Sequence, residues 1–182
     1  SFFILKKLKI KKSKMYLVIL DINGVLVDRE FKPEIDEKEN GKRLGEFLTW
    51  PRPYLKEFLI HLESNYKIAV WSSMQQHNTE NVINEYFPEQ VKANLLFVWS
   101  NSKCTNVGTH PANPNKDLFL KEIDKVLKCF PEYNDSNTII IDDSQLKLAR
   151  NPCQTSLHPV TWNKDNENDV TLKHLIEKHN FF

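Results

Sequence analysis

The sequence predicts an α/β fold, a three-layer sandwich in which helices cover both faces of a central, mainly parallel sheet. The chain of 182 residues has the length of one domain with its own hydrophobic core. Its composition, 40% hydrophobic and 27% charged, is that of an ordinary globular protein. Short apolar runs alternate along the chain with segments of helical periodicity, the order typical of parallel sheets with crossover helices.

The strands are predicted from apolar runs that are short and nearly continuous, as in strands buried on both faces. These runs are 16–20, 67–71, 95–99 and 138–141. A weaker run, 156–160, contains Pro159, and we expect it at an edge of the sheet because proline cannot donate a backbone hydrogen bond.

Helices are predicted where apolar residues recur three and four positions apart. Such periods occur in 55–62, 79–87, 116–130 and 172–176. The polar stretches 29–46 and 100–115 show no such period, and we expect loops or small insertions there. A helix and the first polar stretch fill the interval between the first two strands, which leaves no room for a large cap domain.

The charge balance and the cysteines exclude several classes of protein. The 25 basic residues nearly balance the 24 acidic ones, so we predict no nucleic-acid partner. The longest apolar run, 15–20, is far shorter than the roughly 20 residues that a membrane-spanning helix needs. Cys104, Cys129 and Cys153 lie too far apart in sequence for a disulfide framework or a zinc site of their own. We therefore expect a reducing, intracellular location, nuclear or cytoplasmic.

A basic arm, residues 1–14 with six lysines, is expected to precede the domain at 15–182. The arm is also compatible with the remnant of a targeting sequence, because transit peptides are basic and poor in acidic residues. A mitochondrial location is therefore the alternative to the nucleus or cytoplasm.

Three predicted strands end at residues that can carry chemistry. Asp21 comes directly after the first strand, Ser72 after the second, and Asp142 and Asp143 after 138–141. The carboxyl ends of parallel strands share one edge of a sheet, which is where α/β proteins bind their ligands. Since carboxylate oxygens are preferred ligands of Mg²⁺, the positions predict an oxygen-rich pocket for Mg²⁺ at this edge.

The same residues match, in order, the four motifs of the haloacid-dehalogenase (HAD) superfamily. The matching positions are Asp21-x-Asn23-Gly24-Val25-Leu26, Ser72, Lys116 and Asp142-Asp143. Further segments resemble the RNA polymerase II C-terminal-domain phosphatases, also called the NLI-interacting-factor-like family. They are WPRPYLKEFL at 50–59, NKDL at 115–118 and IIIDDS at 139–144. The resemblance extends over roughly residues 15 to 178 and implies a HAD-like Rossmannoid fold.

The resemblance implies a nucleophile and a metal site. Asp21 would attack phosphorus and form an aspartyl-phosphate that water later hydrolyses. Mg²⁺ would bind the Asp21 carboxylate, the backbone carbonyl of Asn23 and a carboxylate of Asp142 or Asp143, with Asp143 preferred. The ion would neutralise the charge of the phosphate.

The resemblance also implies which residues bind the phosphoryl group. Ser72 would hydrogen-bond a phosphoryl oxygen, and Lys116 would supply a compact positive charge near nucleophile and phosphate. Arg52 is a weaker candidate for binding substrate, since it is equally readable as a structural arginine after a strand.

One position departs from the family pattern. The family has a second aspartate where this chain has Asn23, and that aspartate protonates the leaving oxygen and then deprotonates the attacking water. An amide cannot transfer a proton, and a positioned acid–base group is worth about 10²–10⁴-fold in rate. Three outcomes are open: a slow phosphatase, a phosphatase that uses another acid such as Asp28, or an inactive domain that binds a partner.

The resemblance therefore predicts a Mg²⁺-dependent protein-serine/threonine phosphatase, a phosphoric monoester hydrolase whose uncapped pocket suits a phosphorylated peptide or protein. The alternative is a catalytically inactive HAD-fold interaction protein, such as the receptor-like subunit of the mitochondrial presequence translocase. A phosphatase for a small molecule or a nucleic-acid end is a third interpretation. No pattern in the sequence indicates an oligomeric state.

Overall fold

The computed structural model describes residues 15–32, 41–178 and 181–182. The basic arm expected at 1–14 lies outside these residues. In the described part of the chain, no helix combines the length and the apolar character needed to cross a membrane.

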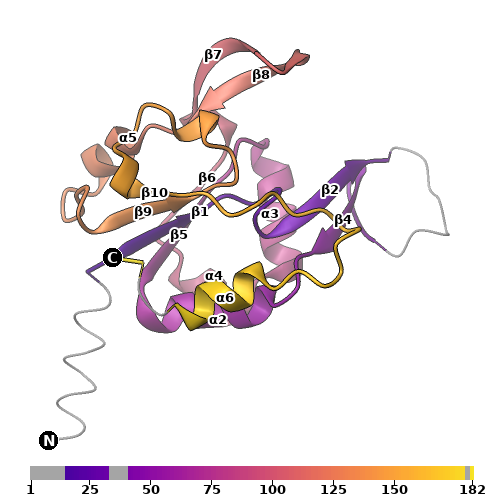
Figure 1. The fold of residues 1–182 in the computed structure, drawn as a ribbon, viewed down its shortest axis with the longest axis horizontal. Coiled ribbons are helices and arrows are strands. Elements are labelled where there is room, and N and C mark those ends of the chain that lie inside the picture. The colour runs from indigo at the N-terminus through magenta and orange to yellow at the C-terminus, as the bar shows by residue number, and fades with distance from the viewer. Residues whose placement is uncertain (1–14, 33–40, 179–180) are drawn as a thin grey trace, which may run out of the picture.

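The central sheet has five strands, all parallel, in the order β10-β9-β1-β5-β6 (Figure 1). In chain order they are β1 (Leu17–Leu20), β5 (Lys67–Trp71), β6 (Val98–Trp99), β9 (Thr138–Ile141) and β10 (Ser156–Leu157). Every residue of β1 and β9 is buried, as expected for strands covered on both faces. The predicted parallel sheet is confirmed, including the edge position of the weak fifth strand.

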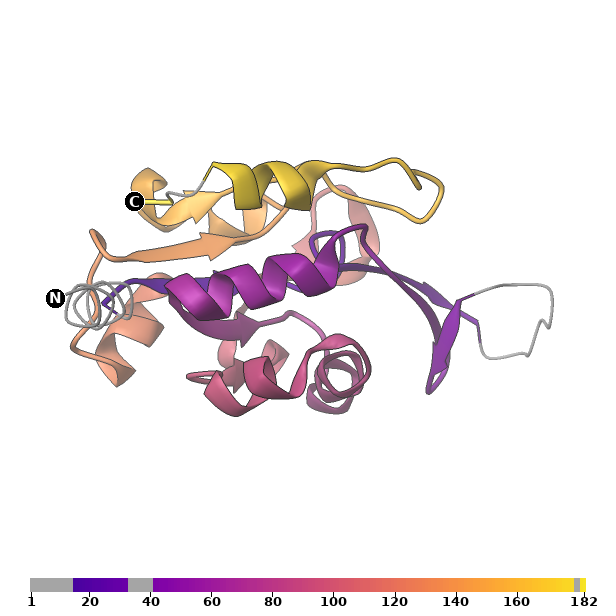
Figure 2. The ribbon, with the colours of Figure 1, turned by 90° about the horizontal axis from the view of Figure 1, so that it is seen from below.

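The sheet separates two hydrophobic cores, because successive residues of a strand face opposite sides. Val18 and Leu20 of β1 face one group of helices. These are α2 (Leu55–Asn65), α3 (Gln76–Tyr86), α4 (Glu89–Asn94) and α6 (Thr171–Glu177). Leu17 and Ile19 pack toward α5 (Ile123–Cys129) on the other side. Figure 2 shows α6, α2 and α4 lying side by side across the first face, which completes the predicted three-layer sandwich.

Two antiparallel insertions account for the polar stretches 29–46 and 100–115. The first is a sheet in the order β2-β4-β3, formed by β2 (Val27–Phe31), β3 (Lys42–Leu44) and β4 (Phe47–Pro51). The second is a hairpin of β7 (Thr105–His110) and β8 (Asn113–Leu120). They follow the ends of β1 and β6, so both lie at the carboxyl edge of the central sheet (Figure 1).

The helix expected at 116–130 is shorter than predicted. Residues up to Leu120 belong to β8, and α5 begins only at Ile123. Leu120 fits the helical period of Ile123 and Val126, but its side chain is buried as part of the strand, two positions after buried Leu118. The sequence did not distinguish the end of the strand from a helix, because Leu120 fits both the alternation of a strand and the period of a helix.

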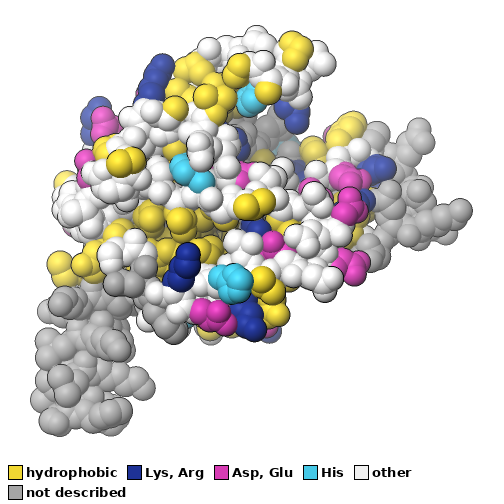
Figure 3. Space-filling model, viewed as in Figure 1, with side chains coloured by type: hydrophobic (Ala, Val, Ile, Leu, Met, Phe, Trp, Pro, Cys, Tyr) yellow, Lys and Arg dark blue, Asp and Glu magenta, His cyan; other side chains and the backbone are white. Residues whose placement is uncertain are grey.

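Charged side chains are interspersed on the face of the molecule in Figure 3, where basic and acidic groups lie near one another. This distribution agrees with the balance of 25 basic and 24 acidic residues in the whole chain. The electrostatic field over this face is therefore set locally, by individual charged groups and their partners.

Candidate active site

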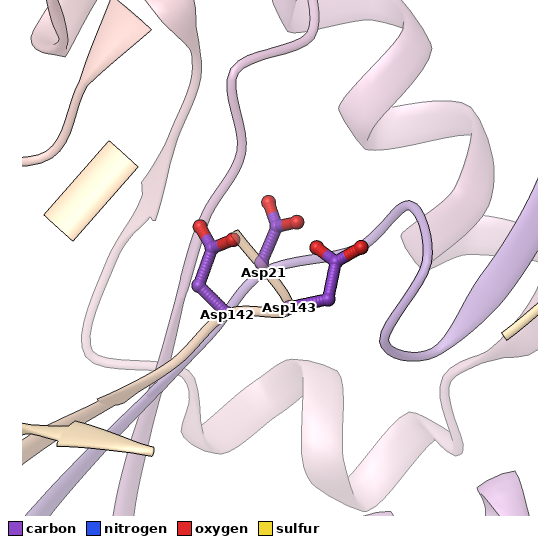
Figure 4. A group of neighbouring side chains, drawn as sticks. All are labelled: Asp21, Asp142 and Asp143. Atoms are coloured by element: carbon purple, nitrogen blue, oxygen red, sulfur yellow. The ribbon is translucent and has the colours of Figure 1, made fainter. Parts of the chain in front are cut away.

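Three aspartates meet at the carboxyl edge of the central sheet. Asp21 follows β1, and Asp142 and Asp143 follow β9. The two strands are neighbours with Leu20 opposite Ile141, so the residues that come next lie side by side. One oxygen from each of the three carboxylates lies within 4.8 Å of the others, and Figure 4 shows the carboxylates gathered above the strand ends.

Lys121 joins two of these carboxylates. Its ammonium lies 2.6 Å from Oδ1 of Asp21 and 2.6 Å from Oδ2 of Asp142, and its side chain has no exposed surface. The backbone holds Lys121 in place, because its N–H donates to the carbonyl of Lys147 and its carbonyl accepts from the Asn151 amide. Charge-assisted hydrogen bonds of this length fix both carboxylates in a single arrangement.

Lys147 brings a second positive charge to the cluster. Its Nζ lies 3.7 Å from Oδ2 of Asp21 and 4.0 Å from Oδ1 of Asp142. Burial opposes the charge of Lys147, but Asp21, Asp142 and Asp143 outweigh it and raise the lysine pKa above its ordinary value. Burial likewise opposes ionisation of Asp142, but Lys121 and Lys147 lower its pKa. Two ammonium groups therefore face three carboxylates. The positive charge of the two lysines does not fully balance the three carboxylates, so the cluster favours a further cation.

One oxygen of the cluster accepts no hydrogen bond within the described part of the chain, although Lys147 lies near it. Among the described residues, Oδ2 of Asp21 is buried without a hydrogen bond. Asp143 is partly buried, and its Oδ2 accepts a hydrogen bond from Thr161 Oγ1 at 2.7 Å. Burial raises the pKa of Asp143. Burial of an oxygen that accepts no hydrogen bond costs free energy unless a ligand binds to it. These oxygens therefore suit a hard cation.

Gly24 packs directly against Asp143. It has a φ of +84°, and a Cβ at this position would lie 2.4 Å from Oδ2 of Asp143. Glycine is the residue that tolerates both the positive φ and the close approach. The turn after β1 therefore helps to set where the Asp143 carboxylate points.

Ser72 and Asn23 lie at the same edge of the sheet as the aspartates. Ser72 follows β5, the other neighbour of β1, and its buried Oγ accepts the backbone N–H of Met74 at 3.1 Å. The Ser72 hydroxyl therefore keeps its own proton to donate. Asn23 lies in the turn two residues after Asp21, and its side chain is exposed. The structure thus brings the predicted positions Asp21, Asn23, Ser72, Asp142 and Asp143 together.

Lys116, a predicted site residue, does not join the cluster. It lies on β8 and is exposed, whereas Lys121, just after the strand, contacts the carboxylates. The sequence contains one local feature at Lys121, although this feature does not reveal which residues Lys121 contacts. It stands directly between the apolar alternation of Leu118 and Leu120 and the helical period that begins at Ile123.

Arg52 lies in structural contacts, which favours the second of the two interpretations that the sequence left open for it. Its Nε and Nη2 donate to the Asp169 carboxylate at 2.8 and 3.0 Å. Its other bonds go to the carbonyls of Gly24 (3.4 Å), Val25 (3.1 Å) and Val160 (3.2 Å). A guanidinium has five N–H donors, and these five bonds use them all. Arg52 therefore ties the turn after β1 to the segment before α6.

We expect Asp169→Asn to destabilise the fold by about 3 kcal/mol near pH 7, because it leaves the buried Arg52 charge without its counterion. Burial opposes ionisation of Asp169, but the hydrogen bonds from Arg52 and Thr171 outweigh it and lower the pKa from its ordinary 3.8. A carboxyl of this kind stabilises the folded state above its unfolded pKa and loses that contribution as the pH falls through its folded pKa.

Urea unfolding at several pH values measures this effect. The difference between wild type and Asp169→Asn should shrink as the pH falls below about 4. Glu89→Gln is the matched control, because Glu89 pairs with Lys92 while its own side chain is 91% exposed. Equal unfolding free energies for the two variants at pH 7 would contradict the buried pair.

Comparisons with known proteins identify the family of this chain. The family model described as NLI interacting factor-like phosphatase matches residues 16–180. An uncharacterized FCP1 homology domain-containing protein of Schizosaccharomyces pombe is 30% identical over 145 residues, which cover 75% of this chain and 57% of the relative. Ubiquitin-like domain-containing CTD phosphatase 1 of Drosophila melanogaster is 27% identical over 158 residues, covering 81% of this chain and 42% of the relative. The chain thus spans about half the length of these two relatives.

Among solved structures, the fold is similar to fission yeast RNA polymerase II CTD phosphatase Fcp1 bound to beryllium fluoride. The TM-score is 0.60 at 13% sequence identity, and the match covers 98% of this chain and 53% of that chain. At this identity the similarity establishes the HAD fold. Since the family model covers nearly the whole chain, the protein belongs to the NLI interacting factor-like phosphatases.

Proposed function

We propose that this domain is a Mg²⁺-dependent phosphatase for phosphorylated serine and threonine in peptides, with Asp21 as the nucleophile. The observation that carries the proposal is the state of the Asp21 carboxylate. Lys121 holds Oδ1 at 2.6 Å, while Oδ2 is buried without a hydrogen bond among the described residues. A carboxylate held in this way is oriented and has an oxygen without a hydrogen bond, as suits a nucleophile.

In the proposed reaction, an oxygen of Asp21 forms a bond to phosphorus as the bond from phosphorus to the alcohol oxygen breaks. The departing alkoxide must then take up a proton from solvent water, because the amide of Asn23 has none to transfer. Water subsequently attacks the aspartyl-phosphate, releases phosphate and regenerates the Asp21 carboxylate. This sequence divides a difficult displacement into two easier ones.

The residues fit a magnesium ion. Asp21, Asp143 and the backbone carbonyl of Asn23 would hold it, with Asp142 beside them, and all offer the hard oxygen donors that Mg²⁺ prefers. Two observations support this assignment: the three carboxylates lie close together, and Oδ2 of Asp21 accepts no hydrogen bond from the described residues. When bound, the ion would supply positive charge against the phosphate.

Three side chains would bind the phosphoryl group. Ser72 has a hydroxyl proton to donate, and Lys121 takes the role that the sequence alone assigned to Lys116. Lys147 is 22% exposed and its Nζ lies 3.7 Å from Oδ2 of Asp21, so its ammonium would lie near a phosphate bound at Asp21. Preorganised positive charge in a largely buried site stabilises the charge that moves onto phosphoryl oxygens in the transition state.

Asn23 is expected to limit the rate of the proposed reaction. Its amide can orient a leaving oxygen but cannot protonate it, so esters whose leaving groups need no proton should react best. Asp28 is held in a structural contact, since its Oδ2 accepts the backbone N–H of Lys164 at 3.0 Å. Asn23 also favours a second candidate function, an interaction domain that keeps the phosphate site but turns over too slowly to act as an enzyme.

Hydrolysis of an aryl phosphate, with and without Mg²⁺, tests the proposal because an aryl oxide leaves without a general acid. We expect slow, metal-dependent release of phosphate by the wild type and no release by Asp21→Asn. Unfolding of both proteins in urea checks that the variant is folded. Metal-independent release, or equal release by Asp21→Asn, would contradict the proposed mechanism, and no release by the wild type would favour the interaction domain.

Gly24→Ala is expected to weaken Mg²⁺ binding by about 10-fold or more, because the new methyl group displaces Asp143 and outer contacts of this kind tune metal affinity. Calorimetric titration with Mg²⁺ measures the change. Gly45→Ala is the matched control, since Gly45 also has a positive φ, +63°, but nothing lies within 4 Å of its Cβ position. Identical Mg²⁺ affinity in the two variants would argue against Asp143 as a ligand.

A further inference from the structure

A groove with a cavity of about 670 Å³ adjoins the candidate active site. One wall comes from β2 and β4, through Arg29, Phe31 and Phe47. Another begins at Ser73, the residue after Ser72, and continues into α3. A chain bound with a phosphate beside Ser72 could therefore continue into this groove.

Arg29 lies in the groove as a cation that has no counterion among the described residues. Its guanidinium carbon lies 3.9 Å from the centre of the Phe47 ring, and its Nη1 contacts the sulfur of Met74. Its Nε is buried with no hydrogen-bond partner, and no carboxylate of the described residues forms an ion pair with it. Burial lowers the pKa of Arg29 to about 10, which still leaves it charged at neutral pH.

A comparison with Arg52 shows which partners the Arg29 guanidinium lacks among the described residues. Arg52 is more deeply buried, but five hydrogen bonds and the Asp169 carboxylate satisfy it. Removing a guanidinium from water without such partners is unfavourable, and an anion supplied by a ligand would offset that cost. The planar fork of an arginine suits a phosphate or a carboxylate, both of which accept two hydrogen bonds at once.

The rest of the groove favours the same kind of ligand. Lys116 also lines it, Glu46 is the single acidic residue of the lining, and His77 adds a further titratable nitrogen. The amides of neighbouring side chains add hydrogen-bond donors: Gln75, Asn78 and Asn101. The lining therefore carries more positive than negative charge, in contrast to the interspersed charges of the face in Figure 3.

We propose that Arg29, assisted by Lys116, binds a second anionic group of a phosphopeptide whose phosphoserine occupies the site at Asp21. The occupant is thus a peptide with two negative groups a few residues apart, and the second group is a phosphate or a carboxylate. This inference rests on the proposed function for the site of the first phosphate. The subsite itself stands on the burial of Arg29 and on the absence of a counterion for it among the described residues.

Binding of synthetic peptides tests the subsite independently of turnover. Three fluorescent peptides each carry one central phosphoserine. They differ in the residue three positions before and three positions after it, which is serine in the first peptide, phosphoserine in the second and glutamate in the third. Anisotropy is measured at about 0.1 M ionic strength, where exposed charges more than about 10 Å apart are largely screened. We expect one or both doubly anionic peptides to bind about 10- to 100-fold more tightly than the serine peptide.

Arg29→Met should abolish this preference, and Lys116→Gln, a change at an exposed position, should reduce it about 3-fold. Arg150→Met is the control, because Arg150 is paired with Glu122 and is not part of the groove lining. Comparison of the phosphoserine peptide with the glutamate peptide shows whether the second group is a phosphate or a carboxylate. Equal binding of all three peptides by the wild type, or a preference that survives in Arg29→Met, would overturn the subsite.

The outcomes separate this inference from the proposed function. A preference that depends on Arg29, without any aryl phosphate hydrolysis, would support the subsite and leave an interaction domain as the function. Hydrolysis without a preference would support the phosphatase and overturn the subsite.

Discussion

Replacing Lys121 with methionine is expected to lower the free energy of unfolding by about 3–5 kcal/mol, because it leaves two buried carboxylates without their shared cation. Lys121 has no exposed surface and lies 2.6 Å from both Asp21 and Asp142. The same change should lower Mg²⁺-dependent hydrolysis of an aryl phosphate by about 10²–10³-fold, as expected when a preorganised group is removed from a site where charge develops. Urea unfolding and initial rates measure the two effects.

The control for this prediction is Lys116→Met. Lys116 is exposed on β8, and such a substitution should change stability by no more than about 0.5 kcal/mol. A stable and fully active Lys121→Met protein would contradict the central place of Lys121. It would also mean that a residue other than Lys121 acts as the active-site lysine.

Changing Asn23 to aspartate is expected to increase hydrolysis of a phosphoserine peptide by about 10²–10⁴-fold. The two side chains have nearly the same shape, and position 23 is exposed, so the new carboxyl group carries little cost of burial. The gain should be smaller for an aryl phosphate, because that leaving group departs with little need for a proton. Steady-state rates with both substrates give the comparison.

Asn23→Ala is the matched variant, since alanine can neither transfer a proton nor hydrogen-bond through its side chain. Its activity should not rise above that of the wild type. If aspartate gave no more activity than alanine in two folded proteins, proton transfer at position 23 would not be what limits this site.

The central strands could be predicted from the sequence because their signal is local. Residues 67–71 and 138–141 form β5 and β9 with the expected bounds, and β1 begins one residue later than expected. Strands covered on both faces need apolar side chains at every position, so a continuous run is enough to find them. The meeting of Asp21 with Asp142 and Asp143 followed from the rule that parallel strands end at one edge.

The roles of Lys121 and Arg52 depend on partners distant in sequence, which no local pattern reveals. Lys121 lies 100 residues from Asp21 along the chain, and Arg52 lies 117 residues from Asp169. Each side chain is charged, and a charged residue in a sequence is usually exposed. The groove lined by Arg29 likewise exists only because β2 folds back against the segment after β5.

The measurement that tests the proposed mechanism most directly is a search for phosphate bound covalently to Asp21. Without an acid–base group at position 23, hydrolysis of the aspartyl-phosphate should be slow, so the intermediate should accumulate. The wild type is mixed with Mg²⁺ and an aryl phosphate, quenched in acid and analysed by peptide mass spectrometry. We predict one phosphoryl group on the peptide that contains Asp21, dependent on Mg²⁺ and absent from Asp21→Asn. Release of phosphate with no modified Asp21, or modification of a different residue, would contradict the assignment of Asp21 as the nucleophile.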